Sequence, residues 1–288
     1  MSRRIGWLFS LPGLVVLIVT IGFPLGYALL LSFSNYSFLA PRFRPWVGIE
    51  HFVSAFQDPY FLHSVWLTAA YMAFTVAVSL ILGFSFAMLL HQPVPGREIY
   101  YSILSIPMLI SPVGVALIWK MIIHPELGIV NYLMVEAGMP RVDWIGSTRS
   151  ALVVVGMIDV WQQVSLVTLI MLAGLRSLPA EPYEAAIVDG ATPFQRFTYL
   201  TLPLMRPVIG VVLILQSIIE LRTYDLIYVL TRGGPGSSTD LLAYFIYRTA
   251  FRGLDLARAS AMSYVLLVLT MVLVVFYYRR VYRETGGN

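Results

Sequence analysis

Long apolar segments, separated by shorter polar stretches, recur six times along this sequence. They cover about residues 5–33, 61–90, 99–123, 150–175, 207–230 and 259–278. Each is long enough for a helix that crosses a bilayer, which takes about 20 residues. A backbone in lipid must satisfy its own hydrogen bonds, and strands of a β-barrel would be shorter and would alternate. The pattern predicts an all-α integral membrane protein, with six transmembrane helices in one domain over residues 1–288.

The composition supports lipid as the surrounding solvent. Hydrophobic residues make up 58% of the 288 residues and charged residues 12%, whereas soluble domains carry about 25% charged residues. So few charges cannot cover the surface of a water-soluble globule of this size. The net charge of +4 is small and the arginines are scattered between apolar segments, so no nucleic-acid partner is expected. We expect a multi-pass protein of the cell (cytoplasmic) membrane, in contact with membrane lipid.

Residue types needed for common enzyme chemistry are missing. The chain has no cysteine, which excludes thiol nucleophiles, disulfides and thiolate metal sites. Its only lysine, Lys120, follows Trp119, so the phosphate-binding pattern GxxxxGKS/T cannot occur. The four histidines show no HExxH spacing. We therefore expect this chain not to be an enzyme, and we expect no catalytic residue, metal site or cofactor.

Arginines flank the first and last segments. Arg3 and Arg4 precede the first segment, which is too long for a cleaved signal peptide and is interpreted as an uncleaved anchor. Three more follow the last segment: Arg279, Arg280 and Arg283. Basic residues beside spans mark the cytoplasmic side, and an even number of spans places both termini on one side. The sequence predicts cytoplasmic termini, with external loops at about 34–60, 124–149 and 231–258.

Local features predict departures from straight, isolated spans. Pro107 and Pro112 are expected to kink the third segment and free backbone carbonyls. Arg222 and Asp225 are three residues apart and are expected to pair on one helix face. The apolar stretch from Asp240 to Phe251 has two interpretations. It is either a helix lying at the membrane interface or an early start of the sixth span.

The cytoplasmic loop at about 176–206 contains residues that typically start and end helices, in a pattern that predicts two short helices. Gly190 suits the left-handed position just after a helix end. Thr192 and Gln195 form the T-x-x-Q pattern of a capping box, with proline at the first helical position. The second helix is expected to end at two prolines, Pro203 and Pro207. From local physics alone, this loop is either a docking surface or a simple connector on the membrane surface.

Two stretches match known patterns. The pattern EAAxxDGAxxxxxFxxxxLPxxxP runs without a gap from Glu184 to Pro207, and it resembles the EAA loop of ABC-importer permeases. The stretch from Leu230 to Thr239 reads LTRGGPGSST. It resembles the TGGGPGxxT segment of carbohydrate-uptake permeases of the maltose-permease type, with Arg232 where that family usually has glycine. Together with the hydropathy pattern, the resemblance covers nearly the whole chain.

The resemblance implies a type I ABC importer permease fold and a role as one subunit of a larger assembly. The implied partners are a second homologous permease, two ATP-binding subunits that hydrolyse ATP, and an extracellular solute-binding protein. It also implies that the EAA helix docks on an ATP-binding subunit and transmits its closure. The implied ATPase-coupling residues are Glu184, Ala185, Ala186, Asp189, Gly190 and Pro203.

Two acidic residues lie inside apolar segments, where ionisable groups are costly and often functional. Asp159 in the fourth segment and Glu220 in the fifth each lie roughly 14 Å from the external end, at 1.5 Å per residue. Gln216, Glu220 and Tyr224 follow i, i+4, i+8 spacing, which predicts one shared helix face. The candidate substrate-path residues are Asp159, Trp161, Gln162, Gln163, Gln216, Glu220 and Tyr224. The alternative is that the two acids only hold helices together.

The expected substrate follows from these charges. Carboxylates and amides hydrogen-bond sugar hydroxyls, so a disaccharide or oligosaccharide is the first expectation. Glycerol 3-phosphate or another polyol derivative is the alternative within the family, and it would favour an arginine-lined path. An alternative of a different class is an ion-coupled secondary transporter, in which the acids would mark an ion path. Six spans without an evident inverted repeat disfavour that class.

Overall fold

The computed structural model describes residues 11–36, 46–93 and 95–283, except the side chains of 281–283. These ranges are helical and contain no β-strand beyond one isolated bridge, between Ser34 and Trp46. The all-α prediction is therefore confirmed. Arg3, Arg4 and the start of the first predicted segment lie outside the described residues, as does the side chain of Arg283.

Five helical stretches are long and apolar enough to cross a membrane: Leu11–Ser32, Pro59–His91, Ala151–Arg176, Pro193–Leu230 and Leu256–Arg280. A sixth span is present if two shorter helices, α5 (Arg97–Leu109) and α6 (Pro112–Ile122), count as one. These two helices are bent by 101°, so the third segment is broken rather than kinked. Pro112 lacks an N–H and excludes the helical conformation from the residue before it. That residue, Ser111, is extended and caps α6 by accepting a hydrogen bond from the Gly114 backbone nitrogen at 3.2 Å.

The chain divides into two compact units. The first contains residues up to His63 together with Phe245–Leu269. Its elements are the π-helical turn η1 (Ile18–Gly22), α2 (Phe23–Ser32), α3 (Glu50–Gln57), the start of α4 (Pro59–His91), the end of α13 (Leu242–Tyr247), the π-helical turn η3 (Arg248–Arg252) and the first part of α14 (Leu256–Arg283).

Contacts within this first unit join segments that are distant in the sequence. The Tyr264 hydroxyl of α14 donates a hydrogen bond to the Leu25 carbonyl of α2 at 2.6 Å. Arg258, also on α14, forms an ion pair with Asp58 at 2.7 Å. The ring of Phe61 is fully buried and packs edge-on against Phe245. These contacts fix the start of α14 against α2 and the start of α4.

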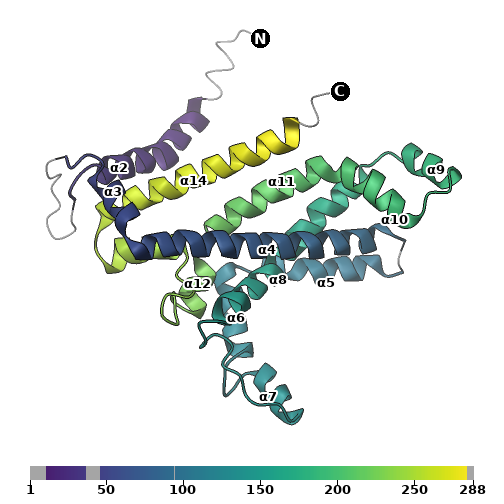
Figure 1. Ribbon diagram of the computed structural model, residues 1–288, viewed down its shortest axis with the longest axis horizontal. Coiled ribbons are helices and arrows are strands. Elements are labelled where there is room, and N and C mark those ends of the chain that lie inside the picture. The colour runs from purple at the N-terminus through teal and green to yellow at the C-terminus, as the bar shows by residue number, and fades with distance from the viewer. Residues whose placement is uncertain (1–10, 37–45, 94, 284–288) are drawn as a thin grey trace, which may run out of the picture. The chain divides into compact units, whose positions relative to one another are not determined.

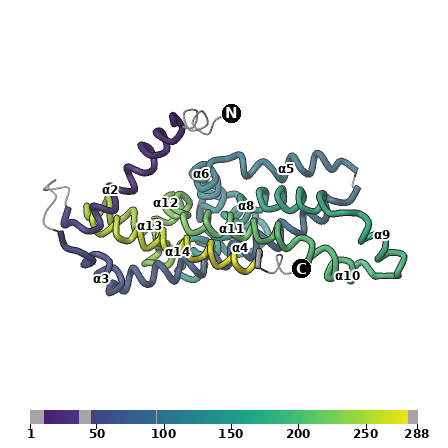
Figure 2. Tube along the Cα trace, turned by 90° about the horizontal axis from the view of Figure 1, so that it is seen from above, coloured from purple at the N-terminus to yellow at the C-terminus, as the bar shows by residue number. Residues whose placement is uncertain are grey.

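The second unit contains Ser64–Tyr244 and the end of α14. Besides α4, α5 and α6, its elements are α7 (Ile129–Glu136), α8 (Ala151–Arg176), α9 (Glu181–Val188), α10 (Pro193–Arg196), the π-helical turn η2 (Phe197–Thr201), α11 (Leu202–Leu221) and α12 (Asp225–Leu230). Figures 1 and 2 show the course of these elements, and α8 contacts four of them: α5, α6, α11 and α12. The unit is therefore built around α8.

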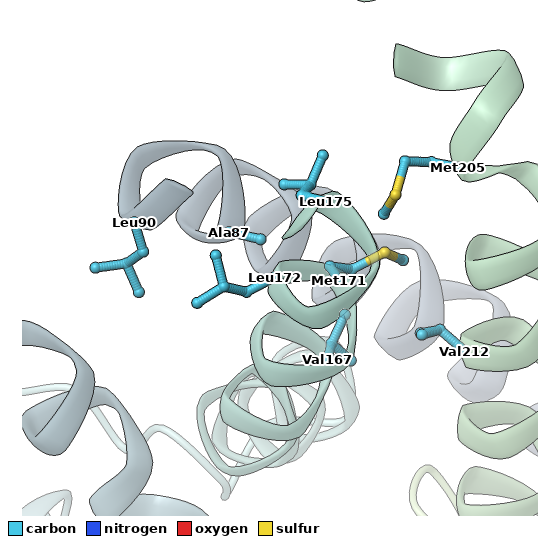
Figure 3. Packing of buried hydrophobic residues seen from close by; sticks show 8 residues of the cluster. All are labelled: Ala87, Leu90, Val167, Met171, Leu172, Leu175, Met205 and Val212. Carbon is cyan, nitrogen blue, oxygen red and sulfur yellow. The ribbon is translucent and has the colours of Figure 1, made fainter. Parts of the chain in front are cut away.

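An apolar core joins the last turns of α4 and α8 to the first half of α11 (Figure 3). Its buried members are Ala87, Leu90, Val167, Met171, Leu172, Leu175, Met205 and Val212. Lipid tails are as apolar as these side chains, so close packing rather than water exclusion must hold the helices together. The two methionines, one from α8 and one from α11, are flexible enough to fill the space between these helices.

Glycines allow the three helices to approach closely. A Cβ atom at Gly83 of α4 would lie 2.5 Å from Val167 of α8, and one at Gly174 of α8 would lie 2.8 Å from Val208 of α11. Both distances are too short for a real contact, so neither site accommodates a larger residue without movement. Small residues at helix crossings are typical of membrane proteins.

Two sequence predictions about helix ends are wrong. Pro203 and Pro207 do not end a helix, because α10, η2 and α11 form one helical stretch in which Pro207 is internal. The π-helical turn η2 precedes these prolines and changes the hydrogen-bond register where Pro203 cannot donate. The stretch from Asp240 to Phe251 is not an early start of the sixth span, and its position at the membrane interface stays a prediction. It forms α13 and η3, separate from α14, and Tyr244 within it is fully buried.

Candidate translocation site and coupling surface

The two intramembrane acids meet in the interior of the second unit. Asp159 of α8 and Glu220 of α11 are buried, with side chains 2% and 1% exposed. Their carboxyl groups lie within hydrogen-bonding reach of each other. The hydroxyl of Tyr71, on α4, donates to Asp159 Oδ2 at 2.6 Å. Three helices therefore converge on one carboxyl pair, as expected for ionisable groups that face a bundle interior.

Hydroxyl groups supply the remaining contacts of Glu220. Thr223 donates to Glu220 Oε2 at 3.4 Å, which is a long hydrogen bond. The Thr75 hydroxyl of α4, close to Glu220, donates instead to the Tyr71 carbonyl at 2.9 Å, and Glu220 Oε1 has no hydrogen-bond donor among the described residues. A buried carboxyl group with a free acceptor atom can take a donor from an incoming molecule.

A polar stripe on α4 faces this pair and was not identified from the sequence. Its members are all buried and are spaced three or four residues apart: Ser64, Thr68, Tyr71, Thr75 and Ser79. That spacing places them on one helix face. Thr68 accepts a hydrogen bond from the Leu242 backbone nitrogen at 2.8 Å. Regular spacing of hydroxyl residues through an apolar segment is the signal that could have revealed the stripe.

Further polar groups near the pair have no partner within the described part of the chain. Both side-chain polar atoms of Gln216, and the hydroxyls of Ser217 and Ser79, are buried without a hydrogen bond there. Gln216 lies one helical turn before Glu220 on α11, and Ser79 lies one turn after Thr75 on α4. These helices run in opposite directions along the bundle, so both residues extend the polar region toward the same end. Buried polar atoms of this kind are uncommon in proteins and need an explanation.

A cavity of about 130 Å³ adjoins the carboxyl pair. Four predicted substrate-path residues line it: Asp159, Gln162, Gln163 and Tyr224. Arg222, Thr223 and Asp225 line it as well. Pockets for drug-sized ligands occupy about 300–1,000 Å³, so this cavity is too small for a disaccharide in the conformation described. It offers carboxyl, amide, hydroxyl and guanidinium groups within one small space.

Two predictions about the geometry of this region are wrong. The helix α11 ends at Leu221, so Tyr224 does not continue the face of Gln216 and Glu220. Tyr224 lies in the break before α12, lines the cavity, and stacks against Tyr228 with ring centroids 5.5 Å apart. The same break separates Arg222 from Asp225, so these two do not share a helix face. The i, i+4, i+8 pattern could not reveal an interruption that tertiary contacts impose.

Trp161 is separated from the pair. Two residues after Asp159 on α8, it points to another side of the helix, and its ring lies edge-on to Trp119 of α6 at 5.6 Å. It is 37% exposed. Trp161 therefore positions α6 against α8 and does not line the cavity.

The broken third segment is tied to the site by polar contacts. Gln162 Nε2 donates to the Ile110 carbonyl at 2.8 Å, in the break between α5 and α6. Lys120, near the end of α6, donates to the Val229 carbonyl of α12 at 2.9 Å. These bonds satisfy carbonyls that the helix ends leave free, which is required where backbone lies at membrane depth. They connect the end of α5 to α8 and the end of α6 to α12.

The loop at 176–206 presents a short capped helix. Glu184 and Ala185 on α9 and Asp189 just after it are exposed, and Ala186 is half-buried. Gly190 has the predicted left-handed conformation, with φ +76° and open space around its Cα atom. The capping box of Thr192 and Gln195 is confirmed, with both reciprocal hydrogen bonds present.

Apolar side chains accompany these coupling candidates. Val188 and Ile187 are 87% and 57% exposed at the end of α9. Pro203 is half-buried near the start of α11. The Tyr183 hydroxyl of α9 hydrogen-bonds Thr201 Oγ1 of η2 at 3.0 Å, which fixes α9 to the helical stretch that continues into α11. The loop is thus an ordered, partly apolar surface.

Comparison with known proteins identifies the family. Residues 79–283 match the family described as binding-protein-dependent transport system inner membrane component. The trehalose/maltose transport system permease protein MalF of Thermococcus litoralis is 34% identical over 279 residues, covering 96% of this chain and 93% of the relative. The sn-glycerol-3-phosphate transport system permease protein UgpA of Escherichia coli O157:H7 is 33% identical over 283 residues, covering 97% and 95%. Because the two relatives are almost equally similar to this chain, the comparison does not indicate which of their two substrate classes applies here.

Solved structures share the fold. The chain superimposes on a subunit from the crystal structure of a bacterial alginate ABC transporter, with a TM-score of 0.84, 24% identity, and coverage of 96% of this chain and 94% of that one. The permease-type resemblance of the two sequence motifs is therefore confirmed at the level of family and fold. This chain belongs to the inner-membrane components of binding-protein-dependent transport systems, as an ABC permease of the carbohydrate-uptake type in the cell membrane.

Proposed function

We propose that this chain forms half of the translocation path of an ATP-driven importer, with the polar region between α4, α8 and α11 as part of that path. The observation that carries the proposal is the buried carboxyl pair with its unpartnered polar neighbours, Gln216 and Ser217, beside a cavity. A bundle that needed only stability would fill these positions with apolar residues. Polar groups inside a membrane bundle are typical of solute paths.

The partners follow from the family. The proposed assembly contains a second homologous permease, two ATP-binding subunits and an extracellular solute-binding protein. The structural relative was crystallised with an alginate pentasaccharide-bound periplasmic protein, which supports the last of these. Hydrolysis belongs to the ATP-binding subunits, because this chain has no phosphate-binding loop.

Coupling is assigned to α9 and the residues after it. Their exposed small and acidic residues, Glu184, Ala185 and Asp189, permit close approach of another backbone and accept hydrogen bonds. Exposed Val188 adds apolar area. Because Tyr183 bonds Thr201, a displacement of α9 is passed to η2 and then along α11 to Glu220. One continuous helical stretch, from α10 to the end of α11, thus connects the surface that contacts the ATP-binding subunit to the polar region around Glu220.

A matched pair of glycine variants tests this coupling. Gly190→Val places a β-branched residue at φ +76°, at a cost of about 1–2 kcal/mol, and Gly138→Val does the same at an identical φ beyond α7. Neither added Cβ atom meets a neighbour within 4 Å. We expect only Gly190→Val to reduce sugar-stimulated ATP hydrolysis by the assembled complex. Normal stimulation in Gly190→Val, or an equal loss in both variants, contradicts the assignment.

The proposed substrate is a neutral disaccharide or oligosaccharide. Asp159, Gln162 and Gln163 offer acceptors and donors for hydroxyl groups, and the Tyr224 ring can cover an apolar sugar face. Since the cavity holds about 130 Å³, it admits only part of such a molecule. A cavity wide enough for the whole molecule would form if α8 moved away from α12, or if the second permease supplied the opposite wall.

Glycerol 3-phosphate is a second candidate, favoured by Arg222. Its guanidinium lines the cavity, and arginine binds phosphate through paired hydrogen bonds. Several relatives are glycerol-3-phosphate permeases at 33–34% identity. The adjacent carboxyl pair opposes this candidate, because it repels a phosphate ester.

Uptake into proteoliposomes separates these candidates. The complete importer is reconstituted with its binding protein, and labelled maltose, trehalose and glycerol 3-phosphate are supplied. We expect sugar uptake that requires internal ATP and persists in Arg222→Gln. Glycerol 3-phosphate uptake that is lost in Arg222→Gln would establish the second candidate. Uptake driven by an ion gradient without ATP would instead establish a secondary transporter.

A further inference from the structure

A second cavity lies beside the coupling helix, well separated from the carboxyl pair. Its volume is about 460 Å³, and it is bounded by the last turns of α4 and α8, the segment 178–180, α9 and η2. The main lining residues are Met88, His91, Leu175, Arg176, Tyr183 and Thr201. The cavity is thus located where two candidate spans end, Pro59–His91 and Ala151–Arg176.

The wall of this cavity is apolar and its rim is basic. Leu175 is buried and Met88 is half-buried, whereas Arg176 and His91, the last residues of α8 and α4, are exposed. A guanidinium makes paired hydrogen bonds to phosphate, and an imidazole can donate another. Span ends lie at the depth of lipid headgroups. Apolar walls below two basic groups therefore match a phospholipid with an anionic headgroup.

A neighbouring pocket lacks basic residues and serves as a comparison. It has a volume of about 380 Å³ and is lined by Phe86, Leu89, Leu90, Tyr100, Ile103 and Leu104. No charged residue is among them. It lies between the last turns of α4 and the middle of α5, and its apolar lining would accept any acyl chain. Headgroup selectivity is expected only at the cavity with Arg176 and His91.

We propose that the cavity beside α9 binds an anionic phospholipid, with the phosphate at Arg176 and His91 and the acyl region against Met88 and Leu175. Basic pockets between transmembrane helices commonly bind anionic lipid headgroups. Tyr183 lines the cavity and belongs to α9, so a bound lipid touches the coupling helix directly. Lipid binding to this cavity does not depend on the proposed transport function. An effect of the lipid on ATP hydrolysis does rest on that function.

Fluorescence quenching tests the binding, because the chain has no cysteine. A label on Ala180→Cys reports the cavity, and a label on Ser102→Cys reports lipid at exposed α5. The full chain is placed in phosphatidylcholine nanodiscs that contain equal fractions of either brominated phosphatidylglycerol or brominated phosphatidylcholine. We expect about a fivefold preference for phosphatidylglycerol at Ala180→Cys, corresponding to about 1 kcal/mol for a basic residue near the membrane surface. No preference is expected at Ser102→Cys.

Charge variants identify the ligand group. Arg176→Gln should abolish the preference at Ala180→Cys, whereas Arg97→Gln, which changes another arginine between the spans, should retain it. An equal response to both brominated lipids at Ala180→Cys overturns the proposal, as does a preference that survives Arg176→Gln. Loss of the preference on addition of inorganic phosphate would show a site for free phosphate and would also overturn it.

The assembled importer gives a separate readout. Phosphatidylglycerol should raise sugar-stimulated ATP hydrolysis in the unmodified complex and should have less effect in Arg176→Gln. Selective quenching without an effect on hydrolysis would leave the lipid site standing and remove its link to coupling. Failure of the proposed transport function, by contrast, would leave the quenching result unchanged.

Discussion

The same three helices, α4, α8 and α11, form two regions of opposite character. Near the loop at 176–206 they pack through Val167, Met171 and Met205, with Gly83 and Gly174 at the closest crossings. Farther along, they enclose Asp159, Glu220 and the hydroxyl stripe of α4. The first region is close-packed and the second retains unpartnered polar atoms and a cavity. One end therefore holds the helices in place, and the other provides polar groups for a solute.

Overpacking the apolar region should have the largest effect. Gly83→Val adds atoms where even a Cβ would lie 2.5 Å from Val167 and 3.2 Å from the Thr168 backbone nitrogen. Overpacking costs about 1–3 kcal/mol of stability. Because the Thr168 backbone cannot move aside as a side chain can, we expect a cost at the upper end of that range. We expect lower yield of assembled protein and a lower unfolding temperature. Gly26→Val is the control, because a Cβ there meets nothing within 4 Å; equal losses would show that Gly83 is not a packing contact.

Neutralising the acids should affect transport more than assembly. Asp159→Asn and Glu220→Gln keep the side-chain volume and remove the charge. If the carboxyl groups bind solute, uptake should fall at least about tenfold, which corresponds to about 1.4 kcal/mol. A change in sugar preference is the alternative expected result. Uptake is measured in proteoliposomes and assembly by co-purification with the ATP-binding subunits. Wild-type uptake in both variants would remove the acids from the path, whereas failed assembly would assign them a structural role.

The hydroxyl of Tyr71 should have the smallest effect. Tyr71→Phe retains the ring and removes only the 2.6 Å hydrogen bond to Asp159. Hydrogen bonds between membrane helices contribute about 1 kcal/mol. We expect a small fall in unfolding temperature with a larger fall in affinity for the sugar, since Asp159 loses its orientation. A fall in unfolding temperature without any change in apparent KM would make Tyr71 purely structural.

Local sequence patterns predicted the features that depend on local interactions. The apolar segments, the left-handed Gly190 and the Thr192–Gln195 capping box follow from periodicity and turn chemistry within a few residues. The intramembrane position of Asp159 and Glu220 was also evident from the sequence, since both interrupt apolar runs.

Features that depend on tertiary contacts were missed. The bend of 101° between α5 and α6 is stabilised by Gln162, which is 52 residues from its partner, Ile110. Tyr71 is 88 residues from Asp159. Tyr224 leaves the face of Glu220 because the chain breaks before α12. Such pairings between distant segments leave no trace in helical periodicity.

The most direct test of the translocation path is protection of a cavity residue by solute. The absence of native cysteine allows a single Gln163→Cys variant, in the cavity lining, to be modified by a water-soluble thiol reagent in the reconstituted importer. Leu133→Cys on α7, where the native side chain is 59% exposed, serves as the control outside the path. We predict that transported sugar, supplied with its binding protein and ATP, slows modification at Gln163→Cys and leaves Leu133→Cys unchanged. Modification of Gln163→Cys at the same rate with and without sugar, in a variant that still transports, would contradict a path through this cavity.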